Sequence, residues 1–214
     1  FDPIPHADIV TSTTHKTLRG PRGGLILAKK EFGDIINKGC PLAMGGPLPH
    51  VMAAKAIAFQ EANKPSFPHY AAQIVQNAQA LAGELMRLGI PITTGGTDNH
   101  LLVADVTSFG ITGRQAEGAL RAAKLTLNRN TIPFDPQGPW YTSGIRLGTP
   151  ALTTLGMGPA EMKIIAKVIH DILKSTKAKE DRSRFVTEEK TLLGATQQVE
   201  ELLATFPVYP EIRI

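Results

Sequence analysis

Residues 10–24, Val-Thr-Ser-Thr-Thr-His-Lys-Thr-Leu-Arg-Gly-Pro-Arg-Gly-Gly, constrain the fold of this chain most. This polar, glycine-rich segment lies between two short apolar ones. The apolar residues before it, Ile9 and Val10, indicate the end of a buried strand, and those after it, Leu25–Leu27, predict a second strand. The glycines between them allow the backbone to turn sharply and to approach a ligand closely. These glycines are Gly20, Gly23 and Gly24.

The same segment holds a single lysine, Lys16, among hydroxyls, a histidine and two arginines. A lysine that reacts with a carbonyl compound must first lose its proton, and cationic neighbours or desolvation favour that loss. An ordinary surface lysine needs no such neighbours. Lys16 is therefore the candidate nucleophile.

Apolar spacing and breaker residues predict alternating helices and strands along the rest of the chain. Thr112 with Gln115 forms a capping-box pattern, whereas Thr187 with Lys190 is a weaker cap for the last helix. The helix expected at 47–62 is buried and begins at an anion-binding turn. The other expected helices are 71–88, 112–124, one that begins at 159 and one after 187. The expected strands are 101–106, 125–127 and 144–147, and residues 133–139 are expected to form a shaped loop.

The linker candidate is Asn63–Pro68, which contains two prolines. We expect a domain boundary there, with residues 1–63 in one domain and 64–214 in the next. A chain of 214 residues with 42% hydrophobic content has enough apolar material for about one and a half ordinary domains.

Composition disfavours several classes of protein. The net charge is +4, but basic residues are scattered among acidic ones without interleaved aromatics, which argues against nucleic-acid binding. No apolar run is long enough for a membrane helix, and the N-terminus does not resemble a signal peptide. The single cysteine, Cys40, fits a reducing cytoplasm. The histidines have no metal-ligand spacing, so we expect no metal.

Four stretches resemble the serine hydroxymethyltransferase family, a group of enzymes that use pyridoxal phosphate. The segment 10–24 is similar to the family's cofactor-lysine signature over fifteen nearly continuous positions. The other three stretches occur in the family's order: Gly-Gly-Pro-Leu-Pro-His-Val at 45–51, Gly-Gly-Thr-Asp-Asn-His at 95–100 and Thr-Ser-Gly-Ile-Arg-Leu-Gly-Thr-Pro at 142–150.

The resemblance implies an α/β fold, the C-terminal half of a fold-type I pyridoxal-phosphate transferase: the end of the large cofactor domain followed by the small α/β domain. It implies reversible transfer of the serine hydroxymethyl group to tetrahydrofolate, giving glycine and 5,10-methylenetetrahydrofolate. Family chains are about twice as long, so we expect Phe1 to be internal to a longer protein. By resemblance the missing part carries further cofactor and proton-transfer groups, and this fragment alone should be inactive.

The resemblance also assigns residues around the cofactor. Lys16 would hold it covalently, assisted by Thr13, and Arg22 would neutralise an anionic oxygen. His15 corresponds to a family histidine that tunes specificity, but it could instead support the loop. Gly45 and Gly46 match the turn that reaches the phosphate of the partner subunit's cofactor, which implies shared sites in a homodimer or larger assembly.

Arg146 matches the family's substrate arginine, whose planar fork suits a carboxylate; a structural salt bridge is the alternative. The pteridine and aminobenzoate parts of tetrahydrofolate are expected at Asn130 and at Gly138, Pro139 and Trp140. Asp98 and His100 should hold the small domain against the cofactor domain by hydrogen bonds.

The chain departs from the family at Cys40–Met44, where relatives carry a phenylalanine, a glycine and a glutamine before the Gly-Gly turn. Cys40 is expected there as a small buried hydrophobe. Two other functions stay open: a threonine-aldolase-like enzyme, which has no need of folate residues, and a non-catalytic fragment.

Overall fold

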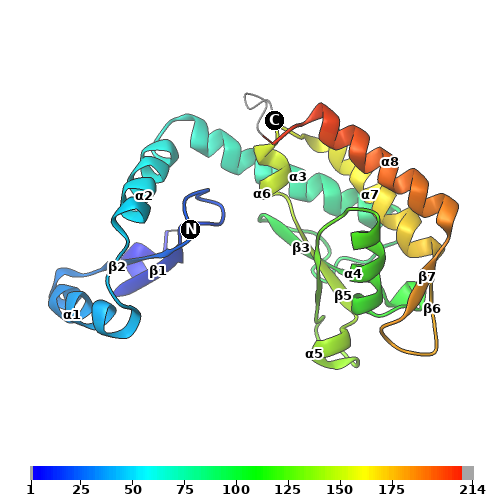
Figure 1. The fold of residues 1–214 in the computed structure, drawn as a ribbon, viewed down its shortest axis with the longest axis horizontal. Coiled ribbons are helices and arrows are strands. Elements are labelled where there is room, and N and C mark those ends of the chain that lie inside the picture. Colours follow the sequence, from blue (N-terminus) through cyan, green and yellow to red (C-terminus); the bar gives the residue numbers. More distant parts are fainter. Residues whose placement is uncertain (1, 209–214) are drawn as a thin grey trace. The chain divides into compact units, whose positions relative to one another are not determined.

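The computed structural model describes residues 2–208 and divides into two compact units, Phe1–Pro68 and His69–Ile214 (Figure 1). The first is unit 1 and the second is unit 2. The expected boundary after residue 63 lies a few residues before the division between Pro68 and His69. Within residues 2–208, no helix is both long and apolar enough to cross a membrane.

Unit 1 is built on an antiparallel hairpin. Strands β1 (Ile9–Thr13) and β2 (Gly24–Ala28) pair in register, with Ile9 opposite Ala28 and Thr13 opposite Gly24. The second predicted strand is therefore confirmed, and the first is present, but Ile9 and Val10 begin it instead of ending it. The other elements are two short 3-10 helices, η1 (Ile4–His6) and η2 (Lys30–Phe32), and two helices, α1 (Gly33–Met44) and α2 (Pro49–Ala62).

The predicted burial of the first strand and of α2 is wrong, and β2 is exposed as well. Ile9 on β1 and Leu27 on β2 are 45% and 49% exposed, and Ala58 is the one buried residue of α2. A two-stranded sheet and two helices are too small a unit to bury the apolar side chains on both faces of the sheet and on the helices. Unit 1 therefore presents apolar side chains outward.

Residues Cys40–Met44 form the end of α1, not a turn. Pro41 lies inside this helix, and the Gly45 amide donates to the Pro41 carbonyl at 2.9 Å. Gly45 then takes φ = 79°, a conformation that glycine adopts without strain. Cys40 is half-buried, so its predicted full burial is also wrong.

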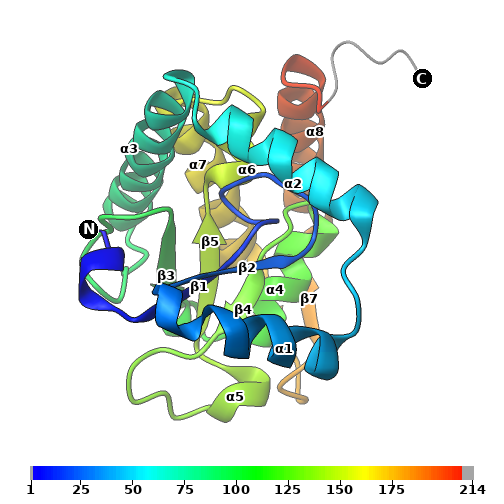
Figure 2. The same cartoon turned by 90° about the vertical axis from the view of Figure 1, so that its left-hand side faces the viewer.

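Unit 2 contains a three-stranded antiparallel sheet in the order β3-β5-β4. Its helices include α4, which packs on the sheet and on α7, and α8, which packs on α7 (Figure 2). Two short strands, β6 and β7, form a separate hairpin. The elements are α3 (Ser66–Arg87), β3 (Leu101–Asp105), η3 (Thr107–Phe109), α4 (Gly113–Ala122), β4 (Asn128–Asn130), α5 (Gly138–Tyr141), β5 (Gly144–Gly148), α6 (Pro150–Thr154), α7 (Pro159–Ser175), β6 (Thr176–Ala178), β7 (Phe185–Thr187) and α8 (Glu189–Thr205).

The core of unit 2 confirms the helical pattern predicted from Pro159 onward. The apolar face of α7 is buried together with residues of α3, α4 and the central strand β5. The α7 side chains in this core include Met162, Ile165, Val168, Ile169 and Ile172. The predicted α/β class is therefore confirmed, and its stability rests mainly on burial of this apolar surface.

Four assignments differ from the expectation. The loop predicted at 133–139 ends early, because Gly138 and Pro139 begin the short helix α5. The α3 helix begins at Ser66 because Pro68 falls in its first turn, where the missing N–H costs no helical hydrogen bond. The third strand is Asn128–Asn130, so the strand predicted at 125–127 is wrong. Thr187 ends β7 and bonds Thr176 at 2.9 Å, so it does not cap α8.

Candidate functional site

Thr14 closes the loop that carries Lys16. Its amide donates to the Gly23 carbonyl at 3.0 Å, its hydroxyl donates to the Pro21 carbonyl at 2.7 Å, and its carbonyl accepts from the Gly20 amide at 2.8 Å. Thr14 is fully buried. One residue therefore connects three points of the 14–24 loop.

The α2 helix supports this loop from outside. Lys55 donates to the Gly24 carbonyl at 2.8 Å, and a Cβ at Gly23 would lie 2.8 Å from the Lys55 Cε atom. A Cβ at Gly20 would come within 2.8 Å of the Thr14 carbonyl oxygen. Glycine is therefore required at position 20, where the close contact is with backbone, whereas at position 23 the end of the Lys55 side chain would have to shift.

The Lys16 side chain is exposed at the end of this fixed backbone. Its ammonium has no hydrogen bond or ion pair with any residue between 2 and 208. Thr13 is half-buried at the end of β1, and Arg22 is exposed in the same loop. An unpaired primary amine on an ordered loop, with a guanidinium nearby in sequence, suits covalent attachment of an anionic aldehyde.

His15 faces its own loop. Its Nδ1 atom lies 3.2 Å from the Gly23 carbonyl oxygen and 3.4 Å from the Gly23 amide nitrogen. These contacts favour the supporting role over direct ligand contact.

The Gly45–Gly46 turn opens onto a pocket of about 650 Å³ in unit 1. The pocket lies between the hairpin, α1 and the start of α2, and Lys55 is its one charged lining residue. A Cβ at Gly45 or Gly46 would meet nothing within 4 Å, so their backbone is open to a ligand. Because α2 begins at Pro49, directly after the turn, its N-terminus is close to this backbone.

Arg146 lies on the open face of the sheet in unit 2. Its register partners are Val103 on β3 and Asn128 on β4, and Asn130 shares that face because it is two residues further along β4. Arg146 is exposed, not desolvated as predicted, and forms no ion pair with residues 2–208. The structural salt bridge therefore has no partner in the described chain.

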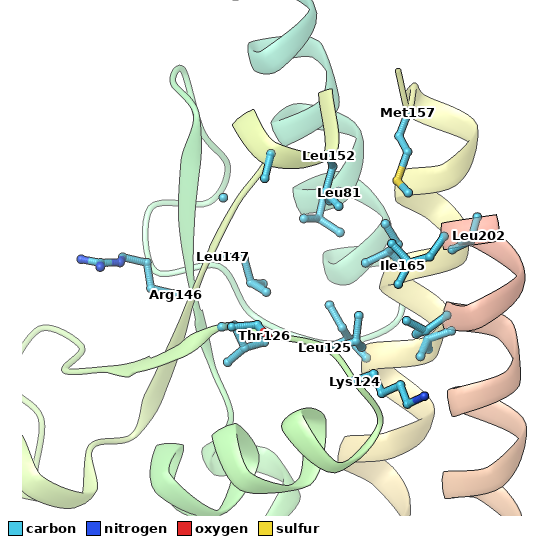
Figure 3. A pocket seen from close by; sticks show the side chains of 17 residues that line it. Leu81, Lys124, Leu125, Thr126, Arg146, Leu147, Leu152, Met157, Ile165 and Leu202 are labelled. Carbon is cyan, nitrogen blue, oxygen red and sulfur yellow. The ribbon is translucent and has the colours of Figure 1, made fainter. Parts of the chain in front are cut away.

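The opposite face of β5 borders an apolar cavity of about 220 Å³. Figure 3 shows Leu147 directed into this cavity and the Arg146 guanidinium directed away from it. Leucine, isoleucine, valine and methionine side chains form most of its wall, and they come from α3, β5, α6, α7, α8 and the connecting segments. The cavity is thus on the apolar side of the strand that presents Arg146.

Asp135 shapes the loop before β5, a role that the sequence analysis missed. Its carboxylate accepts hydrogen bonds from the amides of Ile132, Gln137 and Ser143 and from the Ser143 hydroxyl at 2.6 Å. Burial alone would raise the pKa of Asp135, but these hydrogen bonds, led by that of the Ser143 hydroxyl, hold it below its ordinary value. An Asp-Pro pair in a loop was the available sequence signal.

Trp140 is 60% exposed, but two guanidinium groups lie over its ring. The Cζ atoms of Arg114 and Arg129 are 4.9 and 5.2 Å from the ring centroid. Arg129 is opposite Ile145, so it projects from the sheet face opposite Arg146. The preceding Gly138 has φ = 68° and begins the short helix α5, with Pro139 in its first turn.

The predicted site residues thus fall into two groups. The lysine loop and the Gly45–Gly46 turn are in unit 1, and Arg146, Asn130 and the α5 residues are in unit 2. Asp98 and His100 are both exposed in unit 2, and their predicted role between domains stays a prediction. No cluster of three potential metal ligands occurs within residues 2–208.

Comparison with known proteins supports the resemblance. The family model for serine hydroxymethyltransferase matches residues 1–169. The chain is 57% identical to the serine hydroxymethyltransferase of Chlamydia muridarum over 99% of its own length and 44% of that relative's. It is 53% identical to the serine hydroxymethyltransferase of Salinispora tropica, over 99% of this chain and 46% of that relative. It is also 53% identical to the serine hydroxymethyltransferase of Treponema pallidum, over 99% of this chain and 38% of that relative.

The chain spans less than half the length of these relatives and matches their C-terminal part. The family match covers both the Lys16 loop and the Arg146 strand. The chain therefore belongs to the serine hydroxymethyltransferase family.

Proposed function

We propose that this chain forms part of an enzyme that uses pyridoxal phosphate to transfer the serine hydroxymethyl group reversibly to tetrahydrofolate, giving glycine and 5,10-methylenetetrahydrofolate. The observation that carries this proposal is the exposed, unpaired Lys16 on a loop closed by the buried Thr14. Family membership provides the reaction class.

Lys16 would hold the cofactor covalently, with Thr13 and Arg22 as hydrogen-bonding and charged neighbours. The open backbone of the Gly45–Gly46 turn suits a phosphate, with the Gly46 amide as the donor, because the Gly45 amide already donates to the Pro41 carbonyl. When bound, pyridoxal phosphate supplies an electron sink. The chain's own contribution is to fix the amine, through Thr14 and Lys55, and to offer donors to the phosphate.

Arg146 would bind the serine carboxylate through two parallel N–H donors. Its position on a central strand gives the guanidinium a rigid base, and its lack of an ion pair within the described chain leaves the fork available. Asn130 on the same face, and Gly138, Pro139 and Trp140 in and around α5, would bind tetrahydrofolate. His15 would support the loop by its contacts with Gly23.

We further infer a cytoplasmic homodimer or larger assembly with shared sites, without nucleic-acid or membrane partners. The open Gly45–Gly46 turn supports a site completed by a second subunit. The exposed apolar side chains of unit 1 offer surface for such contacts, since large exposed apolar patches mark interaction sites. A single cysteine fits a reducing compartment.

The test joins the N-terminal part of the Chlamydia muridarum relative to residues 1–214. Because groups that act as a unit are not additive, we expect the 214-residue chain alone to be inactive and the chimera to form glycine from serine only when tetrahydrofolate is present. Lys16→Ala should abolish turnover, and Lys30→Ala, outside the loop, should not.

Two results would contradict the proposal. Equal cleavage of serine or threonine with and without tetrahydrofolate would favour an aldolase-like enzyme. A soluble, folded chimera that binds pyridoxal phosphate but does not turn over serine would favour a non-catalytic role.

A further inference from the structure

Trp140, Arg114 and Arg129 come together from three separate elements of unit 2. Arg114 is in the first turn of α4, Arg129 is in the middle of β4 and Trp140 is in α5. The guanidinium carbons lie 4.9 and 5.2 Å from the Trp140 ring centroid. Tryptophan is the aromatic side chain that attracts cations most strongly, so these contacts hold α5 to its neighbours.

Arg129 is the more firmly anchored of the two arginines. Its Nη1 atom is 2.7 Å from the Glu117 carboxylate of α4, and the side chains of Arg129 and Glu117 are 28% and 13% exposed. Arg121 pairs with the other oxygen of Glu117, at 3.2 Å, but its side chain is 66% exposed. Arg129 is therefore fixed between α4 and Trp140, whereas Arg121 extends into solvent.

Because Arg129 lies in β4, its contacts also affect Asn130, the next residue of the strand. Neighbouring residues on a strand project to opposite faces, so Arg129 faces α4 and Asn130 shares the open face with Arg146. The Arg129 contact thus fixes the backbone from which Asn130 projects. It also fixes α5, which carries Gly138, Pro139 and Trp140.

We propose that Arg129 is a positioning residue that, through Trp140, holds β4 and α5 in the one geometry that binds tetrahydrofolate. The proposal rests on the proposed function, because it takes Asn130 and α5 as folate-binding. Arg129 itself contacts Glu117 and Trp140, so its effect on folate is indirect. It links two segments that are separated in sequence and share no backbone hydrogen bond between β4 and α5.

The first measurement uses the fact that Trp140 is the only tryptophan in the 214-residue chain. Arg129→Met keeps an unbranched side chain but removes the guanidinium. We expect it to shift Trp140 fluorescence emission and to increase quenching by acrylamide, because the ring loses a covering group. Arg121→Met is the matched control, since it removes the other Glu117 partner without touching the ring, and it should leave the emission unchanged.

The second measurement is equilibrium binding of tetrahydrofolate to the chimera described above. Arg129→Met should weaken it about two- to fivefold, as expected for loss of an exposed cation–π contact. Serine affinity should stay the same, because Arg146 is held by the pairing of the central strand β5 with β3 and β4 and contacts neither Arg129 nor Trp140. In a Trp140→Leu background, Arg129→Met should have no further effect on folate binding.

The outcomes separate the inference from the function on which it rests. Unchanged Trp140 emission in Arg129→Met, or a folate effect that persists in the Trp140→Leu background, would overturn the positioning role while wild-type folate binding stays intact. A wild-type chimera that binds no tetrahydrofolate would refute the proposed function, and the role of Arg129 with it.

Discussion

Replacing Thr14 with valine should loosen the loop that carries Lys16. Valine has nearly the shape of threonine, so the buried site stays filled, but the 2.7 Å hydrogen bond to the Pro21 carbonyl is lost. A part-buried acceptor without its donor costs about 1–3 kcal/mol. If this cost falls on local opening of the loop, protected amides within it should exchange about 5- to 150-fold faster.

Hydrogen–deuterium exchange at the Gly20 amide is the suitable assay, because that amide donates to the Thr14 carbonyl at 2.8 Å. Thr14→Ser keeps the hydroxyl and should stay closer to the wild-type rate. Thr11→Val makes the same change at an exposed position of β1 and should not affect the loop. Wild-type exchange at Gly20 in Thr14→Val would refute the view that Thr14 closes the loop.

Three further changes test other parts of the account. Arg146→Lys in the chimera should weaken serine binding by roughly 1.5–3 kcal/mol, as for one lost hydrogen bond between charged groups, with cofactor binding unchanged, and equal loss of both would make Arg146 structural. Folding holds the pKa of Asp135 below its ordinary value, so ionised Asp135 stabilises the fold fully above about pH 4, and this stabilisation is lost as the pH falls through the lower folded-state pKa. Asp135→Asn should therefore make the free energy of unfolding, measured by circular dichroism, less dependent on acid pH. An unchanged pH profile would contradict this. Gly113→Ala should lower the free energy of unfolding, measured by urea denaturation, by about 1–3 kcal/mol because its Cβ would collide with the Gly144 carbonyl oxygen, whereas Gly194→Ala in the open interior of α8 should not lower it.

Local signals in the sequence were sufficient where a few neighbouring residues determine the structure. The Thr112–Gln115 capping box forms as predicted, because both of its hydrogen bonds join residues three apart. The strand carrying Arg146 was also predicted correctly, since an apolar segment followed by a Thr-Pro pair marks both its type and its end. The hairpin around the Lys16 loop followed from its glycines and flanking apolar residues.

Predictions from neighbouring residues failed where the local structure depends on contacts with other parts of the fold. Pro41 concealed α1, because a proline inside a helix normally argues against it. Leu125 and Leu127 have strand-like composition, but they pack against the core of unit 2 outside any strand. The Arg129–Trp140 contact depends on which elements the fold brings together, so no short pattern marks it.

The central claim is that Lys16 is the covalent attachment point of pyridoxal phosphate. The direct measurement is borohydride reduction of the cofactor-loaded chimera followed by peptide mapping of the stable pyridoxyl group. The account predicts that the group is found on Lys16 and that Lys16→Arg carries none. A pyridoxyl group on Lys29 or Lys55 with Lys16 unmodified would contradict it.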